Sequence, residues 1–411
     1  MVAEEYKKLL DEEKSNVRND IHSFHRYFGK FIPAIPAFAI KTFTNEGDTI
    51  LDTFCGSGTS LVEAKFNNRN AIGFDVNPLA IMASRVKTTP IDTEVLEKTF
   101  KRLLEDIESD GDDDYEDPYC VNIDHWFRPE VKKDLLRIRK HILLIDDQTI
   151  RDFYLMVFSA FMRNVSNCDP RHVFPGYSKR LRALDAEGKR QIHVMSSYNN
   201  AVKKRIKQIG TIPNNSSTIT LYNQSSKVLP KEIGDISLVV INPPYISSIR
   251  YLETMKIEMG WLGLINSQKD YIDLDKTLIG TERYYKKDLE QIECSVKIPE
   301  LQEQISNLKR TNPKMAKVVA EYFNDIQIDF SNYVKVLKSG GHVVIKISDS
   351  KVRTEQIPTH EYFIKILEQQ GLKFICKFKD DFDPNSRSLL TARNSYSGIM
   401  TFDWILIFEK P

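Results

Sequence analysis

Short apolar runs and amphipathic stretches divide the chain into two kinds of sequence. In residues 47–90, an apolar run ends at Asp52, a glycine-rich turn and an amphipathic stretch follow, and a second apolar run ends at Asp75. Strand, helix and strand in this order form a βαβ unit and imply a parallel sheet. Further strand patterns cover residues 217–224, 236–241, 340–348, 373–379 and 402–410. The last two predict a closing antiparallel pair, so we expect an α/β protein.

The middle of the chain has a different pattern. Apolar residues recur every three or four positions through residues 95–107, 130–145 and 150–167. This period predicts amphipathic helices rather than strands. We therefore expect three parts, namely an N-terminal helix at 1–21, an α/β domain formed by 22–90 and 216–411, and a mainly helical insertion at 91–215.

The composition is that of an ordinary globular protein. The 411 residues include 58 basic and 57 acidic side chains. No apolar run is long enough to span a membrane, and the charged start lacks the apolar core of a signal peptide, so we expect a cytoplasmic protein. The five cysteines are scattered and form no CxxC pair, which predicts neither a disulfide framework nor a metal site.

Charge is unevenly distributed although the total is +1. Residues 105–117 contain nine acids and no base, whereas residues 171–209 contain ten lysines and arginines against two acids. A near-neutral total therefore allows one basic face. Such a face is the electrostatic signature of a nucleic-acid-binding protein.

The turn after Asp52 contains Gly56 and Gly58 and opens a helical stretch. Glycines let the backbone approach a ligand closely, and an acid about twenty residues later at a strand end accepts a ribose hydroxyl. Asp75 has this position. The sequence lacks the third glycine of a dinucleotide loop and the Gly-Lys-Ser/Thr of a P-loop. The pattern therefore favours a ligand with adenosine but no phosphate, such as S-adenosylmethionine. Asp52 or a nearby backbone group is expected at its ammonium, and Cys55 is expected to be a small turn residue.

Asn242, Pro243, Pro244 and Tyr245 follow an apolar run. Two prolines at a strand end stop the ladder and stiffen the chain at the carboxyl edge of the sheet, where open α/β sheets bind ligands. The Asn242 amide oxygen and the Pro243 carbonyl suit the hydrogens of an exocyclic amino group and the positive charge that builds there. Tyr245 suits stacking on a planar base. This is catalysis by positioning and electrostatics, without a metal or a strong base.

These motifs resemble those of the DNA amino-methyltransferases that modify adenine N6 or cytosine N4. FCGSGTS at 54–60 is similar to the family's cofactor loop, NPPY to its catalytic motif, and HRYFGKFIPAIP at 25–36 to the segment that closes over the cofactor. The resemblance covers 22–90 and 217–410 and implies a Rossmann-like class I methyltransferase sheet. It also implies a cofactor site made of Tyr27, Phe28, Asp52, Phe54, Cys55, Gly56, Gly58, Thr59, Asp75, Val76, Asn223 and Gln224.

The resemblance implies methyl transfer from S-adenosylmethionine to a base flipped out of double-stranded DNA. Asn242 leans toward adenine N6. The sequence at 242–263 is similar to a subgroup that often carries Ser-Pro-Pro-Tyr, and serine leans toward cytosine N4. Adenine is slightly favoured, and cytosine is the alternative. A cognate restriction endonuclease is an expected companion, and the protein is expected to be a monomer or a homodimer.

Other functions fit parts of the pattern. NPPY also occurs in enzymes that methylate a glutamine amide of release factors, but those resemble a shorter chain with a different cofactor loop. Guanine-N2 methyltransferases of RNA usually carry an upstream RNA-binding domain, and only residues 1–21 precede the α/β pattern here. A DNA-binding specificity subunit without catalysis leaves both motifs unexplained. Methylation at cytosine C5 needs a cysteine, typically after proline, and no Pro-Cys dipeptide occurs.

Residues 163–182 mix basic, amide and aromatic side chains without the steady period of a core helix. The basic side chains that suit DNA phosphates are Arg171, Lys179, Arg180 and Arg182. Arg163 and Asn167 suit base edges, because arginine pairs with guanine and asparagine with adenine. A solvated loop with charged flanks is the alternative. A second, weaker basic segment lies at 308–317.

Overall fold

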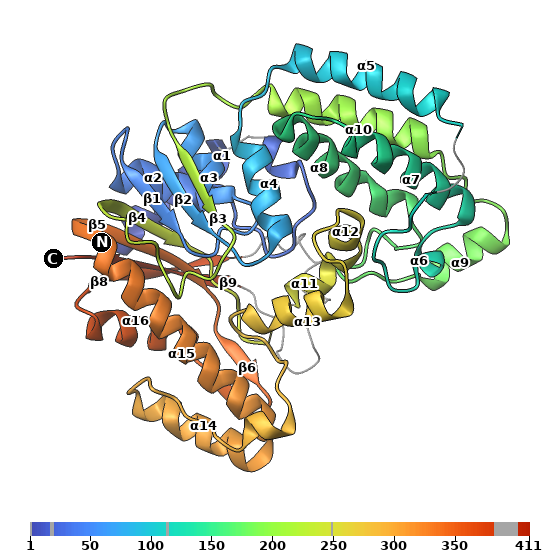
Figure 1. Ribbon diagram of the computed structural model, residues 1–411. Coiled ribbons are helices and arrows are strands. Elements are labelled where there is room, and N and C mark those ends of the chain that lie inside the picture. Colours follow the sequence, from blue (N-terminus) through green and yellow to red (C-terminus); the bar gives the residue numbers. More distant parts are fainter. Residues whose placement is uncertain (1, 17–19, 112–114, 248–249, 382–401) are drawn as a thin grey trace.

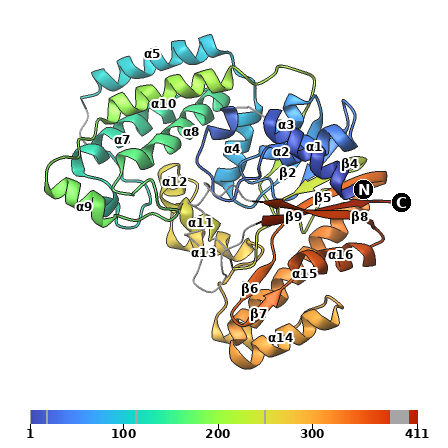
Figure 2. The same cartoon turned by 180° about the vertical axis from the view of Figure 1, so that it is seen from behind.

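The computed structural model describes residues 2–16, 20–111, 115–247, 250–381 and 402–411. Figure 1 shows a twisted sheet with helices on both faces and a separate group of helices beside it. The two ends of the chain lie together on the side of the sheet away from that group, and Figure 2 shows the same arrangement from behind.

Seven strands form the main sheet in the order β3-β2-β1-β4-β5-β9-β8. Their bounds are β1 Thr49–Asp52, β2 Asn70–Phe74, β3 Ile219–Tyr222, β4 Ile236–Ile241, β5 Leu337–Ile347, β8 Lys373–Asp381 and β9 Phe402–Glu409. The first five strands in this order run parallel, whereas β9 runs antiparallel to both β5 and β8. The parallel sheet with its antiparallel end confirms the predicted α/β fold of the class I methyltransferase type.

Alternate residues of the central strands supply two cores, one on each face of the sheet. Ile50 of β1 and Val240 of β4 pack under α1, α2 and α3, whereas Leu51 and Val239 pack under α15 and α16. The bounds of these helices are α1 Val2–Asn16, α2 Ala34–Phe43, α3 Thr59–Phe66, α15 Pro313–Val336 and α16 Thr359–Gln369. The strands are therefore buried on both faces, which explains their continuous apolar sequence.

The third core belongs to the group of helices beside the sheet. The described part of residues 91–215 contains helices and no strand, as predicted for the helical insertion. The helices are α5 Thr93–Ser109, α6 Ile123–Trp126, α7 Pro129–Leu143, α8 Gln148–Val165, α9 Lys179–Ala186 and α10 Val194–Ile209. The apolar faces of α5, α7, α8 and α10 pack together and against Met82 and Val86 of α4 (Pro78–Thr88), so α4 joins this group to the sheet.

The chain after β4 contains further short elements. They are α11 Tyr251–Thr254, α12 Lys256–Trp261, α13 Gln268–Thr277, the 3-10 turn η2 Lys286–Leu289, α14 Pro299–Thr311, and the antiparallel hairpin of β6 Ser350–Val352 and β7 Glu355–Ile357. A second 3-10 turn, η1 Asp20–Ser23, lies between α1 and α2. The sequence pattern did not predict the hairpin, because three residues are too few to show a period. Within the described ranges, no helix combines the length and the apolar character that a membrane span requires.

Four neighbouring parallel strands end at one edge of the sheet. The register aligns Asp52 with Gly73 and Phe74 with Tyr222, so β1, β2 and β3 end at nearly the same level. The polar residues that follow these strands and β4 therefore meet at the carboxyl edge, where sheets of this kind bind ligands.

Candidate active site

A cavity of about 720 Å³ opens at the carboxyl edge of β1, β2, β3 and β4. This volume lies within the range of small-molecule sites. The predicted site residues that line the cavity are Tyr27, Asp52, Phe54, Cys55, Gly56, Thr59, Asp75, Val76, Gln224, Asn242, Pro244 and Tyr245. The glycine turn and the NPPY segment are far apart in the sequence, yet both border this one cavity.

The glycine turn has a shape that requires its two glycines. Gly56 and Gly58 have φ angles of 50° and 76°, which side chains disfavour. A Cβ atom at Gly58 would lie 2.6 Å from the Ser84 Oγ and 3.0 Å from its Cα, so α3 and α4 approach closely there. Cys55 is buried in this turn, and burial raises the pKa of its thiol well above the usual value, which suits a small turn residue.

Asp52 is a buried acid at the end of β1. Its Oδ1 accepts a hydrogen bond from the Phe54 N–H at 3.0 Å, and its Oδ2 accepts one from the Ser60 hydroxyl. Burial raises the pKa of Asp52 to about 7. A buried carboxyl that is costly to ionise favours a ligand that brings a positive charge.

Asp75 follows β2 and faces the same cavity. Its Oδ2 accepts from the Gly56 N–H at 2.9 Å and its Oδ1 from the Asn77 N–H at 2.8 Å. Burial raises the pKa of Asp75 to about 6. Each carboxylate oxygen has two lone pairs, so both oxygens can still accept a hydrogen bond from a ligand hydroxyl.

The NPPY segment follows β4 at the other side of the cavity. Asn242 Nδ2 donates to the Gly29 carbonyl at 3.2 Å, which directs the other end of the amide, Oδ1, away from that backbone. The Tyr245 hydroxyl lies 3.3 Å from this Oδ1. Pro243 is buried and Pro244 lines the cavity. The turn therefore presents an amide oxygen and an aromatic ring beside the predicted cofactor groups.

Four predicted residues do not line the cavity, namely Phe28, Gly58, Asn223 and Pro243. Asn223 Nδ2 donates to the carbonyls of Asp75 and Val76 at 2.9 and 3.0 Å, so it joins the ends of β2 and β3. Of the two neighbouring residues predicted in the cofactor site, Gln224 therefore lines the cavity and Asn223 does not. Phe28 lies beneath the Arg26 guanidinium, 4.5 Å from the ring centre, and is likewise outside the cavity lining.

Arg163 was predicted to reach a base edge, and this prediction is wrong. The side chain is buried in α8 and donates to the carbonyls of Thr254 and Val173 at 3.0 and 3.2 Å. Its guanidinium also lies 3.7 Å from the buried Glu258 carboxylate. Arg163 therefore links α8 to α11 and α12 inside the protein.

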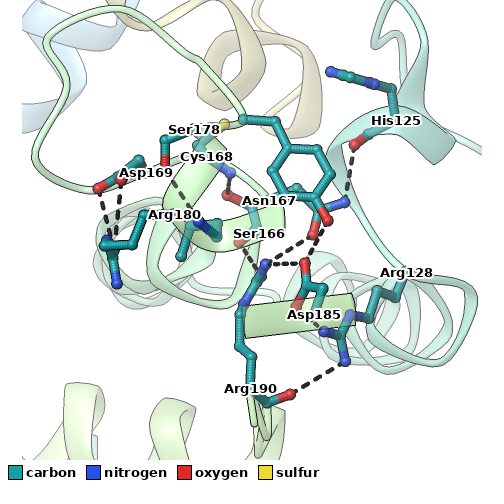
Figure 3. A network of polar contacts seen from close by, with 12 residues as sticks. His125, Arg128, Ser166, Asn167, Cys168, Asp169, Ser178, Arg180, Asp185 and Arg190 are labelled. Atoms are coloured by element: carbon teal, nitrogen blue, oxygen red, sulfur yellow. Dashed lines mark hydrogen bonds and ion pairs between the residues drawn. The ribbon is translucent and has the colours of Figure 1, made fainter. Parts of the chain in front are cut away.

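Asn167 was also predicted to read a base, and it too is buried. Its Nδ2 donates to the His125 carbonyl at 2.9 Å, and its Oδ1 accepts from Arg190 at 3.2 Å. Figure 3 shows the network around it, in which Asp185 pairs with both Arg190 and Arg128. Residues 163–182, predicted to be either a DNA-facing segment or a solvated loop, are thus held in place by hydrogen bonds and ion pairs with neighbouring residues.

The four basic residues predicted to contact phosphates are all exposed, namely Arg171, Lys179, Arg180 and Arg182. Arg171 and Arg180 lie 2.9 and 3.4 Å from the buried carboxylate of Asp169, and the hydrogen bond from Arg171 is the main reason why the pKa of Asp169 is well below its usual value. Arg182 packs over the Tyr177 ring. One buried acid facing two arginines leaves this surface positively charged.

The sequence reasoning missed one wall of the cavity. Residues 277–285, between α13 and η2, line it with Gly280, Arg283 and Tyr284 among them. Arg283 Nε donates to Asp275 Oδ2 at 2.5 Å, which holds this wall in place. A glycine with aromatic and basic side chains between two helical stretches is typical of a binding loop, and this signal was present in the sequence.

The lining suits S-adenosylmethionine better than a phosphate-bearing cofactor. The carboxylate of Asp52 suits an ammonium, that of Asp75 suits ribose hydroxyls, and the Gln224 amide suits the edge of a base. A Cβ at Gly56 would lie 3.2 Å from the Tyr27 ring. The absence of a side chain at Gly56 therefore keeps the space between the turn and this ring open. Lys30, the lysine beside these acids, already donates to the carbonyls of His22 and His25 at 2.7 Å each. The residues present therefore fit this cofactor.

Comparison with known proteins gives consistent matches. The family described as DNA methylase matches residues 4–84. The Type II methyltransferase M.MvaI of Kocuria varians is 24% identical over 96% of this chain and 92% of its own length. The Type II methyltransferase M.BsoBI of Geobacillus stearothermophilus is 22% identical over 99% of this chain and 89% of its own. M.MjaII of Methanocaldococcus jannaschii, also a Type II methyltransferase, is 37% identical over a shorter region, 23% of this chain and 18% of its own.

The family match covers the segment before the sheet, β1, the glycine turn and β2, and the two long matches cover 96% and 99% of the chain. The sheet order and the acidic cavity agree with these matches. These matches support an amino-methyltransferase of the N6/N4 DNA family, with S-adenosylmethionine as its cofactor.

Proposed function

We propose that the protein methylates an exocyclic amino group of a base that is flipped out of double-stranded DNA at a specific site. When bound, S-adenosylmethionine supplies a methyl group activated by its positively charged sulfur. The observation that carries the proposal is that Asn242 and Tyr245 border the same cavity as Asp52 and Asp75. Groups that suit a base amino group thus lie beside groups that suit the cofactor.

The proposed role of Asn242 is to accept a hydrogen bond from the amino group of the base. Its Nδ2 is engaged by the Gly29 carbonyl, which leaves Oδ1 as the acceptor. The Pro243 carbonyl is proposed as the second acceptor. Two acceptors hold the amino nitrogen in position and stabilise the positive charge that develops on it, which is the main way a site without a strong base lowers the barrier.

The proposed role of Tyr245 is to stack on the flipped-out base. The ring follows a rigid prolyl turn and lines the cavity, so little conformational entropy is lost when a base packs on it. Tyr271 and Tyr284 also line the cavity and are proposed as further walls of the base pocket. Base stacking on aromatic side chains is favourable for every base, so these rings hold the base without selecting it.

The proposed DNA contacts lie on the positively charged surface around Asp169. Arg171, Lys179, Arg180 and Arg182 are exposed there, and no base-reading role is proposed for the buried Arg163 and Asn167. Contacts of this kind set affinity and orientation but carry no sequence information. Sequence recognition is therefore proposed to involve other exposed side chains near the mouth of the cavity.

The identity of the methylated base is tested by mass spectrometry of nucleosides from DNA incubated with the protein and S-adenosylmethionine. Asn242 favours N6-methyladenine, and the resemblance of 242–263 to the Ser-Pro-Pro-Tyr subgroup favours N4-methylcytosine. Either product supports the proposal and decides between the two bases. DNA that stays unmodified, with methyl groups found instead on RNA or on protein, would overturn it.

The Type II names of the full-length relatives support a partnership with a restriction endonuclease. DNA from cells that express the protein is then expected to resist an endonuclease of the same recognition sequence. Methylated DNA that every such endonuclease still cuts would speak against the partnership but not against the methyl transfer.

A further inference from the structure

The Tyr245 hydroxyl lies between two acceptors. It is 3.3 Å from Asn242 Oδ1 and 3.0 Å from Asp403 Oδ1 on β9. Asp403 is 1% exposed, and its Oδ2 lies 2.6 Å from the ammonium of Lys346 on β5. The Ser348 hydroxyl donates to the same Oδ1 that faces Tyr245. A buried ion pair between two neighbouring strands thus supports the catalytic motif from behind.

A phenol has one hydrogen to donate, so the two acceptors compete for it. If the Tyr245 hydroxyl donates to Asn242, it occupies one lone pair of that amide oxygen, and this lone pair cannot then accept from the amino group of a base. If the hydrogen is given to Asp403, the amide oxygen is available. Hydrogen bonds to an ionised carboxylate are roughly twice as strong as those to a neutral amide, and the Asp403 contact is also the shorter one.

We propose that Asp403 is a positioning residue for methyl transfer. It takes the hydrogen of the Tyr245 hydroxyl and thereby leaves Asn242 Oδ1 to the amino group of the base. The Lys346 ammonium pairs with Oδ2 of Asp403, so the other carboxylate oxygen, Oδ1, faces Tyr245. This inference rests on the proposed function of Asn242 and adds to it a residue on a strand far from the motif in sequence.

The Asp403→Asn variant reverses the direction of the hydrogen bond. The Lys346 ammonium attracts the oxygen of the new amide, so the amide nitrogen is placed where Oδ1 faced Tyr245. That nitrogen donates to the phenol oxygen, and the phenol hydrogen is then no longer drawn to residue 403 and can be given to Asn242 Oδ1. The substitution keeps the shape of the side chain, so the packing of β9 is preserved.

The test is a double-mutant cycle on duplex DNA with Asp403→Asn and Tyr245→Phe, each alone and combined. Asp403→Asn is expected to lower kcat about tenfold or more, while the cofactor affinity measured by titration calorimetry changes within about twofold. The Tyr245→Phe protein has no hydroxyl that could donate to Asn242. Adding Asp403→Asn to it is therefore expected to change kcat by no more than about twofold relative to Tyr245→Phe alone. Asp152→Asn, which changes a buried ion-paired aspartate of α8, is the matched control.

An equal loss of kcat from Asp403→Asn in both backgrounds would overturn the inference, because a purely structural role does not depend on the hydroxyl. If Asp403→Asn fails to fold, the cycle is repeated with Asp403→Ala combined with Lys346→Met, which removes both charges of the pair and leaves none unpaired in the interior. A wild-type protein that methylates no DNA would overturn the proposed function itself, which is a different result from the failure of the cycle.

Discussion

The backbone N–H of Gly56 donates to Oδ2 of Asp75 at 2.9 Å and so joins the turn after β1 to the acid after β2. The other oxygen of the same carboxylate accepts from the Asn77 N–H, where α4 begins. One acid therefore holds two loops of the cavity in place while it faces the proposed ribose position. Because of these two contacts, we expect the loss of this single strand-end acid to have a large effect on the site.

The Asp75→Ala substitution is expected to weaken cofactor binding by about one to two orders of magnitude, because a charge-assisted hydrogen bond to the ligand is lost and two loop contacts are lost with it. Turnover at saturating cofactor is expected to fall much less. Titration calorimetry measures the affinity. Glu97→Gln on the exposed side of α5 is the control, and equal affinities for both variants would exclude Asp75 from the cofactor site.

Cofactor affinity is expected to rise with pH. Burial raises the pKa of Asp52 to about 7 and that of Asp75 to about 6, so both acids are partly protonated in neutral solution. A bound ammonium favours the ionised form of Asp52, so binding releases a proton below the raised pKa and is weakened as the pH falls through it.

Calorimetry in buffers of different ionisation enthalpy counts the released protons between about pH 5 and pH 8. The Asp52→Asn variant is expected to bind more weakly and to lose the part of the pH dependence centred near the Asp52 pKa. A wild-type affinity that is constant over this range would show that Asp52 does not face the cationic group.

Gly58→Ala is expected to destabilise the protein more than Gly47→Ala. Both positions have a positive φ, 76° and 83°, so both substitutions carry the backbone strain of about 1–2 kcal/mol. Only at Gly58 does the new Cβ also overlap Ser84, at 2.6 Å from Oγ, whereas nothing lies within 4 Å at Gly47. Urea unfolding measures the free energy of unfolding, which is expected to fall by about 1–3 kcal/mol more for Gly58→Ala than for Gly47→Ala. Equal losses would mean that the close approach of α3 and α4 is not a constraint.

Lys179→Ala is expected to weaken DNA binding uniformly across sequences. The loss of one phosphate contact reduces the slope of the logarithm of affinity against the logarithm of salt concentration by about 1. Fluorescence anisotropy at several salt concentrations measures this slope. Lys98→Ala on α5 removes the same charge elsewhere and is the control. If both substitutions reduce the slope equally, Lys179 is not part of a specific DNA-binding surface.

Arg163→Ala is expected to act on stability rather than on DNA recognition. The buried guanidinium pairs with Glu258 and bonds two carbonyls, so its removal leaves a buried acid without its cation, at a cost of about 3–5 kcal/mol. Thermal and urea unfolding measure this loss. A stable variant with altered sequence preference would restore the original base-reading hypothesis.

The parts of the fold that the sequence predicted are those with a strong local period. The strands that end at Asp52 and Asn242 are short apolar runs followed by glycine or proline, and such signals are local. The acid at 75 was found because its distance from the glycine turn is set by one βαβ unit. The clustering of these residues follows from the parallel order of the strands.

The parts that the sequence did not predict depend on tertiary contacts. Arg163 and Asn167 carry the side chains of a DNA-binding loop, but burial and partners from other helices decide their role, and no local pattern reports these. Asp403 lies in a strand, and the sequence pattern of that strand predicts which face of the sheet the side chain is on but not which residues of other strands it contacts. Its contact with Tyr245 joins residues 158 positions apart, which only the order β4-β5-β9 brings together.

The central claim is that the amide oxygen of Asn242 holds the amino group of the target base during methyl transfer. The most direct measurement is the turnover of Asn242→Ala on duplex DNA, together with its cofactor affinity by calorimetry. The account predicts a fall in turnover of about a hundredfold or more with cofactor affinity nearly unchanged. Turnover close to that of the wild type would contradict it.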